Sequence, residues 1–477
     1  MRVCVIGTGY VGLVTGVCLA HIGHQVICVD NNKAKVELMQ SGESPIYEPG
    51  LDEIMRSAMA AGKLYFTTNI NNAIANSQIL FIAVGTPALA TGESDTRYVE
   101  AVARSIGLVI NGEYKVIVNK STVPIGSGDW VLQIINSEIT KRQLDNKPQF
   151  DIVSNPEFLR EGSAIYDTFN PDRIILGSNS NQAITLMQKL YQPIVERKIQ
   201  PISSTETLST QTVPVVVTDL NSAETIKYAA NSFLATKISF INEVANICDK
   251  VGADITQVAQ GIGLDSRIGD KFLQAGIGWG GSCFPKDVSA LIHTANDYGY
   301  DAQLLKSAVQ VNTNQRVLAI EKLQQVLKIL KGKTIGILGL TFKPNTDDLR
   351  DAPAINIIEE LNRLGAKVKA YDPLIRSPHH HPILSTIDLE NNAISLAKDC
   401  DALVLVTDWQ EFKSWNYIKL AQLMKTPMII DERNYLDADT MAAAGFYYIG
   451  IGRRIVNNSL VTKRVQKEVR DVIKKVA

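Results

Sequence analysis

One pattern near the start of the chain constrains the fold more than any other. Residues 2–6 form a short apolar run that predicts a strand, and Gly7, Gly9 and Gly12 follow at once in the spacing Gly-x-Gly-x-x-Gly. An apolar helical stretch comes next, and then a second strand-like run over residues 25–29. A glycine turn between a strand and a helix, within one strand–helix–strand unit, is typical of a doubly wound α/β sheet. We therefore expect the N-terminal part to fold as a Rossmann-type domain.

The same pattern predicts the ligand of this domain. The first glycine makes the turn, the second lets the backbone approach a pyrophosphate, and the third lets helix and strand pack closely. Asp30 ends the second strand, where a carboxylate accepts from a ribose 2′-hydroxyl and repels a 2′-phosphate. We expect NAD rather than NADP, a preference that Lys33 and Lys35 just beyond Asp30 weaken a little.

Composition describes an ordinary globular protein of two or three domains. The chain has 477 residues, of which 45% are hydrophobic and 20% charged, and its net charge is −1. Such a charge does not favour binding to nucleic acid or to an anionic membrane surface, and no apolar run is long enough to span a bilayer. The six cysteines are scattered without pairing or metal-ligand spacing. This usage suits a reducing compartment, so we expect a cytoplasmic protein.

Two further strand-like runs of the N-terminal third end in polar loops. Residues 79–84 lead into Thr86, and residues 115–119 lead into the run Lys-Ser-Thr-Val-Pro, which contains Thr122. Ligands of an open parallel sheet bind at the carboxyl ends of its strands. Both threonines are therefore candidates for ligand contact, with simple turn formation as the alternative.

Two glutamates follow the next strand-like run, residues 151–154. Glu157 and Glu161 are four residues apart beside a proline turn, so they could lie on one helical face. A carboxylate in that position could position or activate water. A solvated pair is the simpler interpretation of this stretch in isolation.

The middle of the chain contains one long helix. Its pattern begins with Asn221 or Ser222 as the N-cap and continues to Gly252, and ~30 helical residues span roughly 45 Å. A helix of this length usually connects domains or forms a dimer interface. Lys227 and Asn231 share one face of it. The lysine is either part of a solvated stripe or a donor to a developing oxyanion.

The C-terminal third repeats the order of elements of the N-terminal third. Its strand-like runs are residues 333–340, 367–371, 401–407 and 428–431, with a helix over residues 352–364. The glycine fingerprint is missing from this part, but Lys343 and Arg350 on the first loop suit a phosphorylated ligand held by side chains. We expect an α/β protein with two Rossmann-type doubly wound sheets joined by a central helical segment. The expected domains are residues 1–212, 213–325 and 326–477.

A single cysteine, Cys283, directly follows the glycine-rich residues 278–282, and Lys286 and Asp287 come three and four residues after it. Small residues leave the Cys283 thiol reachable, and thiolate chemistry needs access and a nearby positive charge. A small buried hydrophobe is the alternative. The histidines, including the run 379–381, form no ligand cluster, so we expect no metal site. Acid–base work would then fall to Lys, Asp, Glu and Thr.

Together these motifs resemble those of the nucleotide-sugar dehydrogenases, the UDP-glucose/GDP-mannose dehydrogenase family, nearly from end to end. The matching runs are residues 7–12, 120–124, 155–162, 227–231, 280–287 and 342–343. The Glu-Phe-Leu-x-Glu-Gly run and the lysine-bearing helix look like the branch that acts on UDP-glucose. Branches that act on GDP-mannose or UDP-N-acetylmannosamine are the alternatives. The resemblance also implies a homodimer or a higher homo-oligomer.

The resemblance implies oxidation of a sugar C6 alcohol to a carboxylate with two NAD⁺ in succession. The first hydride loss yields an aldehyde, which has no second carbinol hydride to give until a nucleophile adds. Cys283 thiolate would add to form a thiohemiacetal, and the second hydride loss would leave a thioester for water to hydrolyse.

The resemblance also implies roles for individual residues. Lys227 would stabilise the oxyanion beside Asn231, Asp287 would orient Lys227 or exchange protons with it and with water, and Thr122 would hold water nearby. Glu157 and Glu161 would flank the pocket, and either could activate the hydrolytic water. The implied cofactor contacts are Gly7, Gly9, Tyr10, Val11, Gly12, Asp30, Lys35, Thr86, Thr122, Glu161, Lys286 and Arg350. The implied contacts to the sugar nucleotide, bound mainly by the C-terminal domain, are Phe158, Leu159, Arg160, Glu161, Lys227, Asn231, Arg267, Phe272, Leu273, Gln274, Ala275, Gly276, Gly280, Lys343 and Arg433.

Two features depart from the family pattern. Residues 202–212 are crowded with serine and threonine and look like an inserted surface loop, and Trp279 stands where many relatives carry phenylalanine. A rival of another class, a protein that kept the fold and lost the reaction, predicts damage at Cys283, Lys227 or Asp287. All three residues are present.

Overall fold

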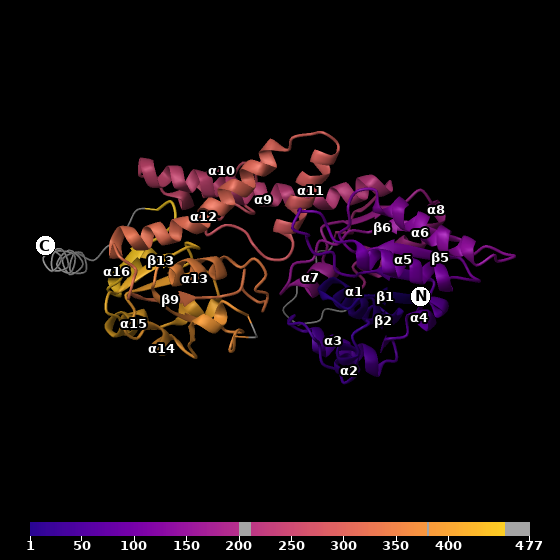
Figure 1. Ribbon diagram of the computed structural model, residues 1–477, viewed down its shortest axis with the longest axis horizontal. Helices are drawn as coiled ribbons and strands as arrows, with labels where there is room; N and C mark the ends of the chain where they lie inside the picture. Colours follow the sequence, from indigo (N-terminus) through magenta and orange to yellow (C-terminus); the bar gives the residue numbers. More distant parts are fainter. Residues whose placement is uncertain (200–210, 379–380, 454–477) are drawn as a thin grey trace, which may run out of the picture. The chain divides into compact units, whose positions relative to one another are not determined.

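The computed structural model describes residues 1–199, 211–378 and 381–453 and divides the chain into two compact units (Figure 1). The first unit comprises Met1–Ala230 with Ser289–Tyr300, and the second comprises Asn231–Val288 with the chain from Asp301 onward. Most of the stretch 202–212, and His379 and His380, lie outside the described residues. The three-way division at residues 212 and 325 stays a prediction.

The first unit is built on an eight-stranded sheet in the order β3-β2-β1-β4-β5-β6-β7-β8. All neighbouring strands pair parallel except β6 and β7, which are antiparallel. The strands are β1 (Arg2–Ile6), β2 (Gln25–Val29), β3 (Leu64–Thr67), β4 (Ile79–Ile82), β5 (Lys115–Asn119), β6 (Phe150–Ser154), β7 (Ile174–Gly177) and β8 (Val215–Thr218). Strands β3 and β8 are thus the two edge strands of this sheet, and β8 follows residue 213.

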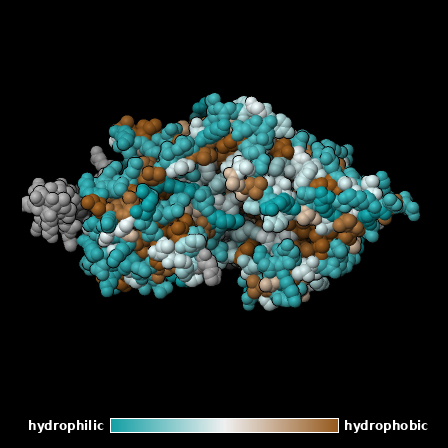
Figure 2. Space-filling model, viewed as in Figure 1, coloured by the Kyte–Doolittle hydropathy of each residue, from teal (hydrophilic) through white to brown (hydrophobic). Residues whose placement is uncertain are grey.

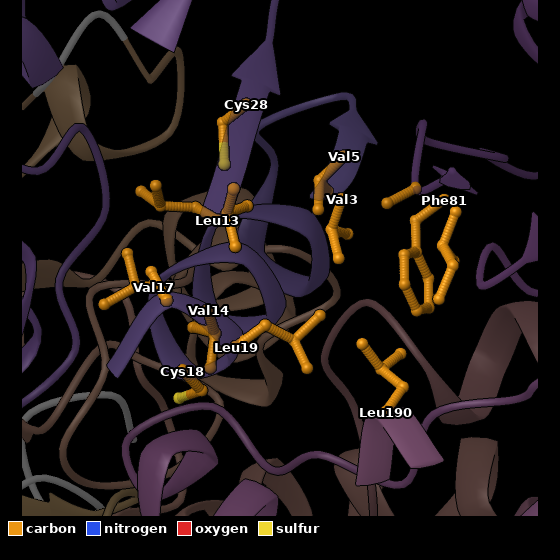
Figure 3. Close-up of a cluster of buried hydrophobic side chains, with 14 of the residues drawn as sticks. Val3, Val5, Leu13, Val14, Val17, Cys18, Leu19, Cys28, Phe81 and Leu190 are labelled. Atoms are coloured by element: carbon orange, nitrogen blue, oxygen red, sulfur yellow. The ribbon is translucent and has the colours of Figure 1, made fainter. Parts of the chain in front are cut away.

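Helices cover both faces of the first sheet. They are α1 (Tyr10–His21), α2 (Lys33–Gln40), α3 (Leu51–Ala60), α4 (Ile70–Asn76), α5 (Arg97–Val109), α6 (Ser127–Lys141), α7 (Ala164–Phe169) and α8 (Asn181–Val195). Successive residues of a strand point to opposite faces, so β1 contributes to two cores. Val3 and Val5 pack against α1, while Cys4 and Ile6 belong to the core beneath α4, α5 and α6. Figure 3 shows the first of these cores, where the labelled side chains are Val3, Val5, Leu13, Val14, Val17, Cys18, Leu19, Cys28, Phe81 and Leu190.

The second unit contains a six-stranded sheet in the order β11-β10-β9-β12-β13-β14, with every neighbouring pair parallel. Its strands are β9 (Thr334–Leu338), β10 (Lys367–Tyr371), β11 (Asp388–Leu389), β12 (Ala402–Leu405), β13 (Met428–Asp431) and β14 (Tyr447–Ile449). Its helices include α13 (Pro353–Arg363), α14 (Ala393–Ala397), α15 (Tyr417–Leu423) and α16 (Ala438–Ala443), with short 3-10 turns at Leu384–Thr386 and Gln410–Ser414. Two buried clusters cover the two faces of the sheet.

A helical segment joins the two sheets in the chain. Its helices are α9 (Leu220–Val251), α10 (Ile255–Gly263), α11 (Phe284–Asp297) and α12 (Gln303–Leu327), and α9 runs unbroken for 32 residues (Figure 1). The predicted fold class, two Rossmann-type sheets with one long central helix, is therefore confirmed. Among the described helices, none is long and apolar enough to cross a membrane.

The start of α9 differs from the prediction. Helix α9 begins before Asn221, and the Asp219 carboxylate accepts from the Ser222 N–H at 2.8 Å, so Asp219 is the capping residue. Glu224 does not cap its own helix. Its carboxylate instead accepts from the N–H groups of Gly126 (2.7 Å) and Gly128 (2.9 Å) at the start of α6. The side chain thus ties α9 to the N-terminus of α6, where a negative charge is stabilised.

Candidate active site

The glycine turn after β1 has the geometry that a bound dinucleotide needs. Gly7 has a φ of +100°, and a Cβ at Gly12 would lie 1.9 Å from the Gly7 carbonyl oxygen, so only glycine fits at either position. A Cβ at Gly9, by contrast, would meet nothing within 4 Å, and Gly9 is the N-cap of α1. Open backbone at a helix N-terminus fits the pyrophosphate of NAD.

Asp30 lies at the carboxyl end of β2 with its charge maintained by neighbours. Its carboxylate accepts from the Thr8 hydroxyl (2.6 Å), the Thr8 N–H (3.1 Å) and the Asn32 N–H (2.9 Å). Burial works to raise the pKa of Asp30, but these hydrogen bonds outweigh it and hold the pKa below its usual value. The side chain is half-buried, and a carboxylate has about four acceptor sites, so a ribose hydroxyl can still bind.

The loops after β4 and β5 are joined at the carboxyl edge of the sheet. The Thr86 hydroxyl donates to the Thr122 carbonyl oxygen at 2.7 Å, and the Ser121 hydroxyl donates to the Val84 carbonyl oxygen, also at 2.7 Å. Both threonines thus lie where the sheet topology predicts ligand contacts. Their contacts to a ligand remain a prediction.

Glu157 and Lys227 form a buried ion pair. Lys227 Nζ lies 2.8 Å from Glu157 Oε1, and each side chain is 5% exposed. Burial works to raise the pKa of Glu157, but Lys227 and a hydrogen bond from the Leu159 N–H outweigh it and hold the pKa below its ordinary value. The Phe158 ring lies beside the pair, 5.4 Å from Lys227 Nζ. Lys227 is therefore not part of a solvated stripe.

The expected helical face shared by Glu157 and Glu161 is wrong. Residues 155–160 have no regular secondary structure, and α7 begins only at Ala164. The start of α7 is instead held by a glutamate that sequence reasoning missed, Glu48, which accepts from the Ala164 N–H at 2.7 Å. Glu48 also accepts from the Gly162 N–H at 2.7 Å and from the Tyr10 hydroxyl. It therefore links the glycine turn to the loop that carries Glu161.

A small cavity adjoins Lys227. Its volume is about 10 Å³, close to the room that one water molecule needs by this measure. Thr122, Lys227, Glu224 and Asn119 are among its lining residues. Within the described parts of the chain, neither polar atom of the buried Asn119 side chain has a hydrogen-bond partner. This cavity is the place where Thr122 is predicted to hold a water molecule near Lys227, and that role stays a prediction.

In the second unit, Cys283 lies at the start of α11. Its carbonyl oxygen accepts from the Asp287 N–H at 2.8 Å, which makes Cys283 the residue at the helix N-terminus. Its thiol is 3.6 Å from the Ser282 hydroxyl. A helix N-terminus stabilises negative charge and so favours a thiolate. Cys283 is partly exposed, whereas the other five cysteines are buried, so the alternative of a buried Cys283 is wrong.

Asp287 is fully buried and connects two of the predicted site residues. Asn231 Nδ2 donates to Asp287 Oδ2 at 2.6 Å, and Lys286 Nζ lies 2.5 Å from Asp287 Oδ1. The Asp287 carboxylate thus binds the Asn231 side-chain amide through one oxygen and the Lys286 ammonium through the other. Asn231 follows Lys227 by one turn of the continuous helix α9, so the two side chains leave the helix on the same face.

The loops around Cys283 pack tightly enough to require glycine. Gly281 has a φ of +83°, and a Cβ there would lie 2.6 Å from the Phe342 ring. A Cβ at Gly280 would lie 2.2 Å from the Asp351 carbonyl oxygen. The Trp279 indole N–H donates to the Ser239 hydroxyl at 3.0 Å, which a phenylalanine could not do.

Of the residues predicted to bind the sugar nucleotide, residues 158–161 and Lys227 lie in the first unit, and those in the second unit include two loops. Phe272 has a φ of +65°, and the loop that it begins is held where the Gly276 N–H donates to the Asn242 side chain at 2.8 Å. Arg433 Nη2 donates to the Phe342 carbonyl oxygen at 3.2 Å, on the loop that carries Lys343. These residues belong to two tightly packed loops.

Three predicted arginines are bound to neighbouring aspartates instead. Arg160 pairs with Asp167 at 2.6 Å, Arg267 with Asp265 at 2.6 Å and Arg350 with Asp348 at 2.7 Å, all with largely exposed side chains. Lys35 lies in α2 with an exposed side chain. The ligand contacts of these four residues stay predictions.

The fold, the glycine turn and the partly exposed thiol are those of an NAD-binding oxidoreductase, and comparisons with known proteins agree. The family models of the UDP-glucose/GDP-mannose dehydrogenase family match residues 1–195 (NAD binding domain), 221–314 (central domain) and 336–438 (UDP binding domain). The chain belongs to this family. The predictions of family, enzyme class and NAD as the cofactor are thereby confirmed.

Individual proteins that resemble this chain over nearly its whole length are UDP-glucose dehydrogenases. UDP-glucose 6-dehydrogenase TuaD of Bacillus subtilis is 49% identical over 96% of this chain and 94% of its own length. UDP-glucose 6-dehydrogenase of Pseudomonas aeruginosa is 42% identical over 95% of this chain and 98% of its own. The solved UDP-glucose dehydrogenase of Pyrobaculum islandicum has a TM-score of 0.85 at 34% identity, covering 95% of this chain and 98% of that one.

Proposed function

We propose that this protein oxidises UDP-glucose to UDP-glucuronate at C6, with the loss of two hydrides per substrate. The observation that carries the proposal is the similarity to UDP-glucose 6-dehydrogenases, up to 49% identity over nearly the whole chain. The partly exposed thiol supports it, because oxidation beyond the aldehyde requires a group that adds to the carbonyl carbon.

In this proposal NAD, bound at Gly7–Gly12 and Asp30, supplies the hydride acceptor. Cys283 sulfur forms a bond to the aldehyde carbon, and the carbonyl oxygen takes up a proton to give a thiohemiacetal. Loss of the second hydride, and of the hydroxyl proton, leaves a thioester. Water then cleaves the carbon–sulfur bond, which releases the carboxylate and returns the thiol.

Lys227 and Asp287 support the proposed chemistry in different ways. Lys227 would stabilise negative charge on the substrate oxygen, and its ion pair with Glu157 holds its ammonium in one place. Asp287 would fix Asn231 and Lys286 through its two oxygens. The geometry gives Glu157 a counterion, which makes it a weaker base than a free carboxylate.

The test measures NADH formed per molecule of nucleotide sugar. We expect two NADH per UDP-glucose, and much slower turnover of GDP-mannose and UDP-N-acetylmannosamine. Faster turnover of GDP-mannose or UDP-N-acetylmannosamine than of UDP-glucose would overturn the substrate assignment. Cys283→Ser should form at most one NADH and no thioester, while Cys248→Ser, which changes a buried thiol, is the matched control. Two NADH from Cys283→Ser would overturn the covalent step.

We also propose that the protein is a homodimer that uses α9. Phe233, Phe240, Ile247 and Val251 are 53–71% exposed and lie within one narrow stripe, because their spacings are 7, 7 and 4 residues. The face drawn in Figure 2 is mainly hydrophilic, with apolar side chains in separate groups. Phe240→Arg should give a monomer by light scattering. Asp249→Arg, on the opposite side of α9, should leave the dimer intact, and a wild-type monomer would contradict the proposal.

We further propose a cytoplasmic location, with which the six free cysteines are consistent.

A further inference from the structure

A second lysine lies buried near the Glu157–Lys227 ion pair. Lys120 follows β5 directly and is only 9% exposed. Its ammonium donates to Asn155 Oδ1 at 3.1 Å, a neutral amide oxygen rather than a carboxylate. The Tyr191 hydroxyl donates to the same oxygen at 2.6 Å, and the Asn155 amide in turn donates to the Ile175 carbonyl at 2.8 Å. A full positive charge is thus buried against a neutral acceptor, which is unfavourable.

The charges that face Lys120 come from the loop after β6 and from α9. Burial is the largest influence and lowers the pKa of Lys120 to about 8, the nearby Glu157 carboxylate acts to raise it, and the Lys227 ammonium acts to lower it. From α8, Tyr191 contributes a hydroxyl whose pKa burial raises, so it remains a neutral donor. Glu157 therefore has two lysines near it, one in direct contact and one held by Asn155.

The fold itself does not require this ammonium. If the Lys120 ammonium were absent, Asn155 Oδ1 would still accept from Tyr191, so no buried polar atom would lose its last partner. Replacing a buried charge that forms no ion pair by an apolar chain of similar length removes the cost of taking that charge out of water. A charge that is unfavourable for folding and unnecessary for hydrogen bonding needs another explanation.

We propose that Lys120 is a positioning residue that sets the charge state of the Glu157–Lys227 pair. Its positive charge favours the ionised form of Glu157 and opposes the protonated form of Lys227. While Lys120 is charged, Glu157 therefore releases its proton at lower pH than it would without Lys120. The role rests on the proposed function, in which Lys227 faces the substrate oxygen.

The first experiment compares pH profiles of kcat/KM. In Lys120→Met, Glu157 should hold its proton more strongly, so the acid limb of the profile should move to higher pH, by about one unit. Lys120→Arg keeps the charge and should keep the wild-type acid limb, even if turnover is slower. An unmoved profile in Lys120→Met, or the same shift in Lys120→Arg, overturns the proposal.

A matched control lies on the same strand. Lys115, at the other end of β5, is 3% exposed, and its ammonium donates to the carbonyl oxygens of Ser77 (2.5 Å) and Ala75 (3.2 Å). Lys115→Met leaves these acceptors without that donor, so its Tm should fall while its pH profile stays in place. Lys120→Met should show the opposite pattern, an unchanged or higher Tm and a displaced profile. A Tm loss in Lys120→Met as large as in Lys115→Met would mean that Lys120 is structural.

A readout without catalysis separates this inference from the proposed function. Between pH 8 and the ordinary lysine value of about 10.4, the unfolded wild-type chain binds a proton at Lys120 that the folded chain lacks. Wild-type stability from this group therefore rises with pH in that window. The Tm of Lys120→Met relative to wild type should fall over the same window. A constant difference would refute a buried, titrating Lys120 even if the enzyme acted on another sugar.

Discussion

Removal of Lys227 should lower the free energy of unfolding, because it breaks the buried ion pair with Glu157. In Lys227→Met, Glu157 remains buried and keeps the Leu159 N–H at 2.7 Å and the nearby Lys120 charge, but loses its partner at 2.8 Å. Breaking a buried pair by removing one member costs about 3–5 kcal/mol. Because Glu157 retains two favourable neighbours, we expect the lower end, about 3 kcal/mol. Total stabilities of roughly 5–15 kcal/mol make this loss easy to measure.

The assay is equilibrium unfolding in urea at pH 7 and pH 5. The double variant Lys227→Met/Glu157→Gln removes both charges and should recover most of the loss. The sign of the pH effect follows from the pKa of Glu157. In the wild type this pKa is lowered, so the stability that it contributes is present at pH 7 and declines as the pH falls. In Lys227→Met, burial raises the pKa of Glu157 because its lysine partner is gone. Protonation of Glu157 at pH 5 then removes the cost of a buried unpaired charge, so wild type and Lys227→Met should differ less in stability at pH 5 than at pH 7. A loss below about 1 kcal/mol at pH 7, or a double variant no more stable than the single one, would refute the reasoning.

Three further substitutions have outcomes that the structure specifies. Gly12→Ala places a Cβ 1.9 Å from a backbone carbonyl oxygen of the glycine turn, so NAD binding measured by calorimetry should be lost; wild-type affinity would contradict the packing argument. Gly281→Ala adds strain at a φ of +83° and a clash with Phe342, and thermal unfolding should show a loss of about 1–3 kcal/mol, whereas an unchanged Tm would count against it. Trp279→Phe loses the hydrogen bond to Ser239 and part of a buried ring, so we expect about 1–3 kcal/mol less stability and an unchanged kcat, and a large fall in kcat would show a role beyond packing.

Local sequence was sufficient where one segment decides its own structure. The strand, glycine turn and helix at the start of the chain, and the length of α9, follow from hydrophobic periodicity and from glycine positions. The same reasoning failed for Glu157 and Glu161. Their spacing suggested a helix, but partners far away in the sequence hold that loop: Ile175 accepts from Asn155, and Lys227 pairs with Glu157. No local pattern contains those partners.

Capping residues show the same limit. The predicted N-cap of α9 was Asn221 or Ser222, and the observed N-cap is Asp219. The difference of two or three residues is close to the range over which helix ends are ambiguous. Glu224, in the first turns of α9, binds the first turn of α6, almost a hundred residues earlier in the chain. A carboxylate near one helix start in the sequence can serve another helix, because only the packed structure brings the second one within reach.

The sequence by itself determined the two sheets, the glycine turn, the NAD preference and the accessible cysteine, because each depends on residues that are close together in the chain. Only the tertiary structure decided which charged groups are buried together. Asp30 and Asp372 both follow the second strand of their sheet, yet Asp30 is half-buried and Asp372 is 1% exposed beneath the Trp409 indole, which donates to it at 3.0 Å. Likewise, a lysine in the run Lys-Ser-Thr-Val-Pro has no evident role until folding places Lys120 near Glu157. Electrostatic environment is a property of the packed molecule, since burial and distant charges set it together.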